Sequence, residues 1–157
     1  MKLAQEHLLK THAKNRQFDY IIFRPICVFG NYDLGDRLVP KFIKSAINNQ
    51  EIFYSQDTIT DITYVDDMVQ GLELAIESDC KNQTFNISSG QTLTIKQLAD
   101  IIVEHYNSTS KLIPVNREKY FPNRGSLVID KIETMLGYER RFDLHQALEK
   151  IDADTIY

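Results

Sequence analysis

Glycine and proline are scarce in this sequence, with six glycines and four prolines among 157 residues. No Gly-x-Gly-x-x-Gly or Gly-x-x-Gly-x-x-Gly pattern follows a predicted strand, which excludes a glycine-rich cradle for a dinucleotide phosphate in this chain. The two cysteines, Cys27 and Cys80, form no Cys-x-x-Cys or Cys/His pattern. The sequence therefore predicts neither a disulfide framework nor a zinc site, and it predicts a reducing, cytoplasmic setting.

Long apolar runs and clusters of positive charge are also missing. No stretch approaches the ~18 apolar residues of a membrane helix, and no charged-then-apolar leader is present, so no membrane association is expected. The formal net charge is -4. Because nucleic-acid backbones are bound through clustered Lys and Arg, nucleic acid is not an expected partner.

What is present is a globular composition, 43% hydrophobic and 25% charged, with alternating helical and strand patterns. Helices are predicted at residues 2–16 and 38–48. Strands are predicted at 19–24, 51–55 and 112–115, and residues 84–90 read as a strand that ends in a glycine turn. The alternation predicts a single α/β unit over residues 1–157, with a smaller substructure toward the carboxyl end.

Further helix starts are predicted where Thr or Asp precedes an apolar run, and Gly137 is predicted to end one of these helices. Asp66 and Asp67 resemble a paired-carboxylate site, but their place at a helix start favours capping over catalysis. The predicted starts are Asp66 and Asp67, Thr94 with Gln97, Asp130 with Glu133, and Asp143.

Five segments form an ordered pattern that covers nearly the whole chain. They are "KLAQEHLL", "FRPICVFG", "ITYVDDMVQGLELAI", "TFNISSGQTLTIKQLADII" and "NRGSLVIDKIETMLGY". In this order they resemble the extended short-chain dehydrogenase/reductases that act as nucleotide-sugar epimerases, dehydratases and reductases. The first segment is similar to the helix that follows the Tyr-x-x-x-Lys pair of that family, with Lys2 at the lysine position and Glu6 one turn later.

The resemblance implies the carboxyl-terminal part of an extended Rossmann-type α/β fold, with its small substrate-binding subdomain. The glycine-rich nucleotide-binding half and the catalytic Tyr would then precede Met1. In that family a tyrosinate acts as general base while hydride passes to the nicotinamide, and the lysine lowers the phenol pKa and holds the cofactor ribose. The resemblance assigns that catalytic and cofactor-binding role to Lys2, places Pro25 and Ile26 beside the nicotinamide, and implies NAD or NADP as the cofactor of the complete enzyme.

For the sugar nucleotide, the resemblance gives both matches and departures. Cys27 stands where the family has an Asn that touches the substrate, and Thr60 stands where it commonly has an Arg. Arg37 is a candidate to replace the missing cation, and Arg124 is a candidate diphosphate ligand because a guanidinium can fork onto phosphate oxygens. The predicted substrate-binding residues are Cys27, Arg37, Leu38, Phe53 and Arg124.

Two functions remain open. One is the sugar-nucleotide-binding part of an NAD(P)-dependent epimerase, dehydratase or reductase, inactive on its own; the spacing from Gly125 to Asp130 resembles the reductase branch and leaves the reaction type undecided. The other is a non-catalytic nucleotide-sugar-binding or scaffold module, which the changes at Cys27 and Thr60 favour.

The predicted strand 19–24 is nearly continuously apolar, which is typical of an inner strand of a parallel sheet. Without a neighbour it presents an apolar edge that invites pairing or aggregation. A homo-oligomer or a complementing amino-terminal half is therefore an expected partner, and the isolated chain is expected to be poorly soluble or oligomeric.

Overall fold

A computed structural model describes residues 1–33, 37–56, 58–116 and 125–156. Within these residues no helix is both long and apolar enough to cross a membrane. The helices are α1 (Lys2–Arg16), α2 (Leu38–Ile47), α3 (Val65–Glu77), α4 (Ile95–His105), α5 (Asp130–Leu136), α6 (Leu144–Glu149) and the short 3-10 helix η1 (Ala153–Thr155). The strands are β1 (Ile21–Pro25), β2 (Val28–Phe29), β3 (Ile52–Ser55), β4 (Ile59–Asp61), β5 (Thr63–Tyr64), β6 (Gln83–Ile87), β7 (Thr92–Thr94) and β8 (Leu112–Val115).

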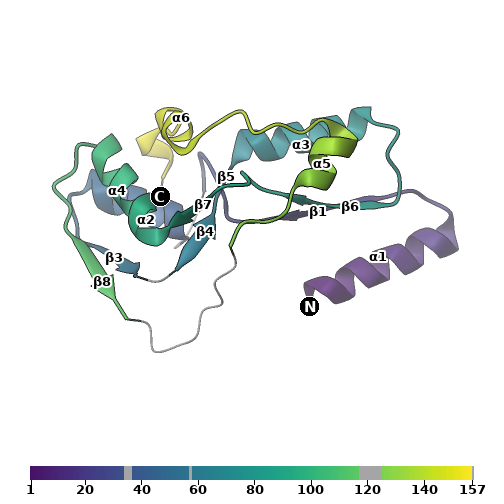
Figure 1. Cartoon of the computed structure of the whole chain (residues 1–157), viewed down its shortest axis with the longest axis horizontal. Coiled ribbons are helices and arrows are strands. Elements are labelled where there is room, and N and C mark those ends of the chain that lie inside the picture. The colour runs from purple at the N-terminus through teal and green to yellow at the C-terminus, as the bar shows by residue number, and fades with distance from the viewer. Residues whose placement is uncertain (34–36, 57, 117–124, 157) are drawn as a thin grey trace.

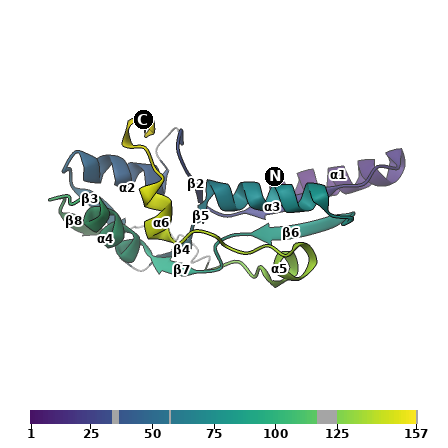
Figure 2. The same ribbon diagram turned by 90° about the horizontal axis from the view of Figure 1, so that it is seen from above.

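The strands pair in twos (Figures 1 and 2). Three pairs are parallel, β1 with β6, β2 with β5, and β3 with β8, whereas β4 pairs with β7 in antiparallel fashion. In the β1–β6 pair the register sets Ile21 opposite Gln83 and Pro25 opposite Ile87. Both strands therefore end at the same edge, which is where α/β proteins place ligands.

The first core lies around α2, α4 and α6, which pack beside β3 and β8 at one end of the molecule (Figure 1). Helix α4 contributes Leu98, Ala99 and Ile102, all fully buried, at the i, i+1 and i+4 spacing of one helical face. Ile43 of α2 and Leu148 of α6 are each 1% exposed. The part of the molecule around α2, α4 and α6 thus has a closed hydrophobic core of its own.

The second core lies around β6, between α3 and α5. Phe85 and Ile87 of β6 and Ile132 of α5 are fully buried. Helix α3 approaches β6 closely at Gly71, where an added Cβ would lie 2.3 Å from Cδ1 of Ile87. Any larger residue there would have to displace the end of the Ile87 side chain, so the glycine allows this close approach.

Helix α1 stands apart from both cores, beyond β1 and on the opposite side of the β1–β6 pair from α3 (Figures 1 and 2). Ala13 is its single buried residue. Leu3 and Leu8 are 62% and 60% exposed. A 15-residue helix has only marginal stability in water by itself, so α1 depends on whatever contacts hold it to β1.

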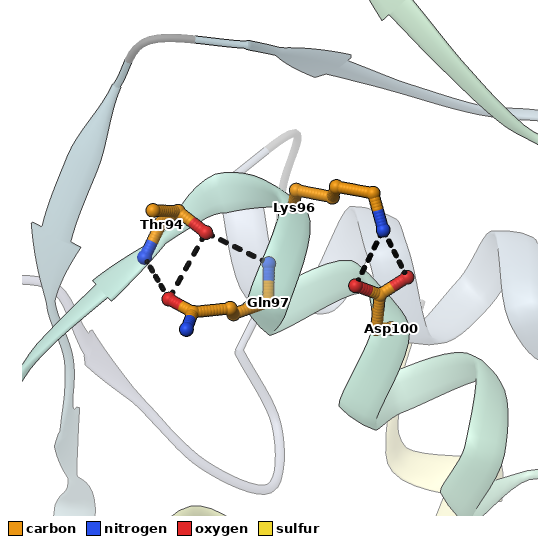
Figure 3. Close-up of polar contacts among 4 residues, drawn as sticks. All are labelled: Thr94, Lys96, Gln97 and Asp100. Carbon is orange, nitrogen blue, oxygen red and sulfur yellow. Dashed lines mark hydrogen bonds and ion pairs between the residues drawn. The ribbon is translucent and has the colours of Figure 1, made fainter.

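The predicted helix at 2–16 and the strand at 112–115 are confirmed with the same bounds, and the helix predicted at 38–48 ends one residue earlier. The strand predicted at 19–24 begins later and includes Pro25, which is tolerated at a strand end. Thr94 and Gln97 form the predicted capping box at the start of α4 (Figure 3), and Asp143 forms one with Gln146 at the start of α6. Gly137 ends α5 in the left-handed conformation, as expected.

Two predicted caps are wrong. Ile129, without a side-chain cap, precedes α5, so Asp130 and Glu133 are first-turn residues and form no capping box. Helix α3 begins after Tyr64, again without a side-chain cap, and Asp67 accepts a hydrogen bond from the distant backbone of Arg141. The sequence signal, a carboxylate at a helix start, does not reveal that a buried carboxylate will choose a tertiary partner.

Candidate functional site

The carboxyl ends of β1 and β6 bring together the chain segments that the sequence singled out. Strand β1 ends at Pro25, beside the end of β6 at Ile87. The loop after β1 contains Cys27, and the loop after β6 turns at Gly90, whose φ is +71°. A positive φ favours glycine, so this turn is built to reverse the chain at the sheet edge.

Lys2 and Pro25 line one groove between α1 and β1, with a volume of about 530 Å³. Both side chains are exposed. An ammonium group at a helix start next to the end of a parallel strand carries the donors that the hydroxyl groups of a ribose accept, which is the chemistry that a dinucleotide cofactor would require there. These residues therefore fit the cofactor that the sequence implies, whereas Ile26, half-buried, does not line the groove.

Glu6 joins the two walls of this groove. Its carboxylate accepts two hydrogen bonds from Arg24, from Nε at 2.8 Å and from Nη2 at 2.6 Å. The Arg24 guanidinium lowers the pKa of Glu6, and the carboxylate in turn raises the pKa of Arg24. Such a bidentate pair fixes the angle between two groups as well as their distance, so it sets α1, and with it Lys2, relative to the end of β1.

Thr63 holds the loop that follows β1. Its hydroxyl donates to the carbonyl oxygen of Ile26 at 3.0 Å, and its backbone N–H donates to the carbonyl oxygen of Cys27 at 3.1 Å. Thr63 is fully buried. The loop therefore enters the site in one fixed conformation, in which Cys27 has a φ of +38°.

Cys27 is half-buried and is a free thiol. Burial raises the pKa of its thiol, while a hydrogen bond with Thr60 and the charge of Arg37 act in the opposite direction. A thiol with a raised pKa is a poor nucleophile at neutral pH. The position that the family fills with an amide thus carries a small, weakly polar side chain.

Arg37, the predicted replacement cation, is already paired. Its Nη2 lies 2.9 Å from Oδ1 of Asp33, whose side chain is 6% exposed, while the Arg37 side chain is 64% exposed. Nη1 of Arg37 donates to the carbonyl oxygen of Val28 at 3.5 Å. Part of its charge is therefore directed to the protein, although its exposed face remains open to a phosphate.

The remaining predicted substrate residues do not form one described cluster. Leu38 packs against the first core, whereas Phe53 is 56% exposed on β3. Arg124 lies outside the described residues. Lys2 and Pro25 thus line one groove, whereas Leu38 and Phe53, two of the predicted substrate-binding residues, lie apart from each other.

Asp61 is the residue that the sequence reasoning passed over. It is fully buried at the end of β4. Its Oδ1 accepts from the backbone N–H of Ser89 at 3.2 Å and from the Ser89 hydroxyl at 2.7 Å, and its Oδ2 accepts from the Ser126 hydroxyl at 2.7 Å. One carboxylate thereby ties together β4, the turn after β6 and the segment leading to α5. The single signal in the sequence was an Asp inside the otherwise extended run "TITDITY".

Asp67 and Tyr138 are buried polar groups next to this tie. Asp67 is 1% exposed, and burial raises the pKa of its carboxyl despite hydrogen bonds from the backbone of Arg141 and Phe142. Tyr138 is fully buried and donates to the carbonyl oxygen of Ser88 at 3.1 Å, and burial raises its phenol pKa. Neither residue lines the groove at Lys2. Their hydrogen bonds instead join segments that are distant in the sequence.

Comparison with curated proteins places these features in a wider group. The chain is similar to the dTDP-4-dehydro-6-deoxyglucose reductase of Escherichia coli, with 24% identity over 96% of this chain and 49% of that protein. It is also similar to UDP-glucuronic acid decarboxylase 5 of Arabidopsis thaliana, with 26% identity over 98% of this chain and 46% of that protein. The chain spans about half the length of these curated relatives.

Solved structures share the fold. The UDP-glucose 4-epimerase of Thermotoga maritima, solved with UDP-glucose, matches with a TM-score of 0.82 and 25% identity, covering 98% of this chain and 50% of that one. The UDP-glucuronic acid 4-epimerase of Bacillus cereus, solved with UDP-glucuronic acid and NAD, matches with a TM-score of 0.83 and 24% identity, covering 99% of this chain and 50% of that one. These matches confirm the predicted Rossmann-type α/β fold.

Residues 1–88, more than half of the chain, match the family model described as "NAD dependent epimerase/dehydratase family". This range includes the groove residues Lys2 and Pro25 and the buried tie at Asp61. Together with the fold matches to nucleotide-sugar epimerases, the family match shows that the chain belongs to the NAD-dependent epimerase/dehydratase family, among its extended short-chain dehydrogenase/reductase members.

Proposed function

We propose that this chain supplies the sugar-nucleotide-binding part of an NAD(P)-dependent nucleotide-sugar epimerase, dehydratase or reductase, and that it turns over no substrate by itself. The observation that carries the proposal is the groove that Lys2 shares with Pro25 at the carboxyl end of a parallel strand pair. Proteins that this chain resembles act on UDP- and dTDP-sugars.

In this proposal Lys2 holds the cofactor ribose, and Glu6 with Arg24 sets the position of the helix that carries it. NAD or NADP supplies the hydride chemistry when bound. The chain contributes binding and orientation: the loop at Cys27, fixed by Thr63, forms the floor next to the sugar, and Arg37 and Arg124 offer guanidinium groups to the diphosphate. Leu38 and Phe53 supply apolar surface for the nucleotide base.

Thermal unfolding of the chain with and without ligands tests this proposal. UDP-glucose, UDP-glucuronic acid and dTDP-glucose would each be added at millimolar concentration, alone and with NAD. At least one nucleotide sugar should raise the Tm, because a ligand that binds only the folded state stabilises it. A mixture with NAD should show no conversion of the sugar; conversion by the chain alone would contradict the second half of the proposal.

A matched pair of variants separates cofactor binding from sugar binding. Lys2→Met should abolish any Tm rise caused by NAD and leave the rise caused by the nucleotide sugar intact. Lys10→Met, on the same helix but outside the groove of Lys2 and Pro25, is the control and should change neither. If no nucleotide sugar and no dinucleotide shifts the Tm, the proposed function is wrong.

One observation favours a second candidate, a nucleotide-sugar-binding or scaffold module without catalysis. Arg37, the candidate to replace the cation missing at Thr60, is already paired with Asp33. Cys27, which stands where the family has an Asn, is a thiol whose pKa is raised by burial. Neither departure is therefore compensated by a strong polar group. This second candidate would be supported if a nucleotide sugar raised the Tm of the chain but was not converted in the presence of NAD, either by the chain or by any complex that contains it.

A further inference from the structure

The loop that follows β2, residues 30–33, is held at both of its ends. At Gly30 an added Cβ would lie 2.4 Å from Cγ1 of Val65, so this glycine lies directly against the first turn of α3. Asp33 has a side chain that is 6% exposed, and its Oδ1 lies 2.9 Å from Nη2 of Arg37, at the start of α2. A loop anchored at both ends loses much of its conformational freedom in the folded state.

Asn31 ties the middle of this loop to the segment that follows α6. Its Nδ2 donates to the carbonyl oxygen of Lys150 at 3.1 Å, and its Oδ1 accepts from the Asp152 N–H at 2.9 Å and from the Thr155 hydroxyl at 3.1 Å. Thr155 is buried in η1, which packs against α2, and the chain after α6 turns toward α2 in both views (Figures 1 and 2). One amide side chain therefore uses both of its polar atoms to join segments that are distant in the sequence.

Tyr32 shows that this loop is held against its local preference. Its φ is +62° although it is not a glycine, and it is 69% exposed. A bulky residue with a positive φ is sterically disfavoured, and such a conformation persists only where neighbouring contacts determine it. Because the Tyr32 ring is mostly exposed, the contacts that hold this conformation are those of its neighbours Asn31 and Asp33.

Arg37 depends on the same loop. Among the described residues no hydrogen bond reaches the carboxylate of Asp33, so its ion pair with Arg37 is the described contact that offsets the buried charge. Separation of such a pair would leave a buried charge without a partner, which holds the two groups together. Nη1 of Arg37 also donates to the carbonyl oxygen of Val28, the residue after Cys27, at 3.5 Å. The guanidinium thus lies in a set orientation beside the loop that is predicted to touch the substrate.

We propose that Asn31 and Thr155 are positioning residues for Arg37, and that they fix its guanidinium for the diphosphate of a sugar nucleotide. Thr155 bonds to Asn31, which holds the loop backbone. Two residues further along that backbone, Asp33 orients Arg37 through the ion pair. A guanidinium whose orientation is set before binding loses less conformational freedom when it binds phosphate oxygens. This inference rests on the proposed function, which gives Arg37 the diphosphate as its ligand.

NMR relaxation of the Arg37 Nε–H group in the ligand-free chain tests the positioning directly. In Asn31→Ala the order parameter of this group should fall below about 0.6, the flexible range, because all three bonds to residues 150–155 are lost. The matched control is Asn48→Ala, which removes an amide that donates to the carbonyl oxygen of Lys44 at the other end of α2. This control should leave the order of Arg37 unchanged.

Thr155→Val and Thr155→Ser form a second matched pair. Valine keeps the shape of threonine and removes the hydroxyl that donates to Oδ1 of Asn31, whereas serine keeps this hydroxyl. Thr155→Val should therefore lower the order of Arg37, and Thr155→Ser should restore it. The amide spectrum of α4 shows in each variant that the chain is folded. An Arg37 Nε–H group that keeps its order in both Asn31→Ala and Thr155→Val would overturn the proposal.

Titration of the whole chain with UDP-glucose tests the consequence for binding. Arg37→Ala should raise the Kd about tenfold, since a charge-assisted contact with phosphate is lost. Asn31→Ala should raise the Kd about fivefold, and in the Arg37→Ala background it should add nothing, because it acts through the guanidinium. A second fivefold rise in that background would show that Asn31 has a merely structural role and would overturn the proposal.

The outcomes separate this inference from the proposed function. If UDP-glucose binds the unmodified chain and Asn31→Ala with the same Kd, the positioning role is wrong and the proposed function stands. If UDP-glucose, UDP-glucuronic acid and dTDP-glucose all fail to bind the unmodified chain, the proposed function is wrong, and the diphosphate as the ligand of Arg37 is wrong with it.

Discussion

The two ends of this molecule differ in how completely they are packed. Around the first core, α2, α4 and α6 close over β3 and β8, and α4 contributes fully buried residues such as Leu98 and Ile102. Around β1, the strand has one open edge among the described residues, and α1 buries only Ala13. Apolar burial is therefore concentrated in the two cores, and α1 with the groove of Lys2 lies outside both.

This difference assigns separate roles to the two ends. A closed core can hold its shape without a partner, because its apolar surface is already removed from water. A helix and a strand edge that face solvent gain most from a partner, because that surface is still to be buried. The carboxylate of Asp61 joins the two ends, since its partners Ser89 and Ser126 lie in segments that lead to β7 and α5.

The largest expected effect, and the strongest test of the difference in packing between the first core and α1, comes from a cavity made in the first core. Leu98→Ala should lower the free energy of unfolding by about 4 kcal/mol, because Leu98 is fully buried and the site cannot collapse around the gap. Leu8→Ala on α1, where Leu8 is 60% exposed, is the matched control and should cost less than about 0.5 kcal/mol. Urea unfolding measures both, and equal costs would show that α1 is packed as tightly as α4.

The next effect concerns the tie between the two ends. Asp61→Ala should lower the free energy of unfolding by about 3 kcal/mol, because it removes a fully buried carboxylate that accepts three hydrogen bonds from the half-buried Ser89 and Ser126. Asp66→Ala, an exposed neighbour, is the control and should change little. Loss of cooperativity in the Asp61 variant, with two separate transitions, would show that this carboxylate couples the cores; a cost no larger than that of Asp66→Ala would refute the tie.

The sequence predicts those features of the fold that depend on neighbouring residues better than those that depend on distant partners. Periodic apolar spacing and local caps, such as Thr94 with Gln97, depend on neighbours in sequence, so α1, α2 and β8 were predicted with correct or nearly correct bounds. Asp67 and Asp130 were predicted as caps and are not. The carboxylate of Asp67 accepts a hydrogen bond from the Arg141 backbone, and Asp130 is the first residue of α5, after the N-cap Ile129. A choice between a local and a distant partner is not encoded in local spacing.

The site divides in the same way. The resemblance of short motifs assigned both Lys2 and Pro25 to the cofactor, and in the structure both residues line one groove. The roles of Asp61 and Thr63 were not predicted, since each acts through segments that are remote in the sequence. Pairing of Arg37 with Asp33 across four positions had a local signal, but that signal competes with many other surface charges.

A smaller effect comes from the buried carboxyl of Asp67. Burial raises its folded-state pKa, so the folded protein binds a proton that the unfolded chain has already lost. Stability should therefore fall as pH rises from the unfolded value of about 3.9 through the raised folded pKa. Asp67→Asn keeps an acceptor for the Arg141 N–H and should remove this decline; urea midpoints across that pH range, unchanged between the two proteins, would contradict it.

The smallest effect is at the open end. Arg24 lowers the pKa of Glu6, so the pair is present above the ordinary carboxyl pKa and is lost as pH falls through the lowered value. Glu6→Gln should speed amide exchange in α1 and leave the global Tm unchanged. The exchanged pair, Glu6→Arg with Arg24→Glu, should restore slow exchange, and Lys96→Gln, which breaks the ion pair with Asp100 within α4 (Figure 3), should alter neither. Unaltered α1 exchange in Glu6→Gln would show that the pair does not hold the helix.

Residue-resolved amide exchange of the isolated chain tests the central claim most directly. We predict that the amides around Leu98 and Ile102 exchange only through global unfolding, and that those around Leu8, Ile21 and Phe23 exchange by local opening, orders of magnitude faster. Protection of α1 and the open edge of β1 at the level of α4 would contradict the account, because it would show that this end of the molecule is complete without a partner.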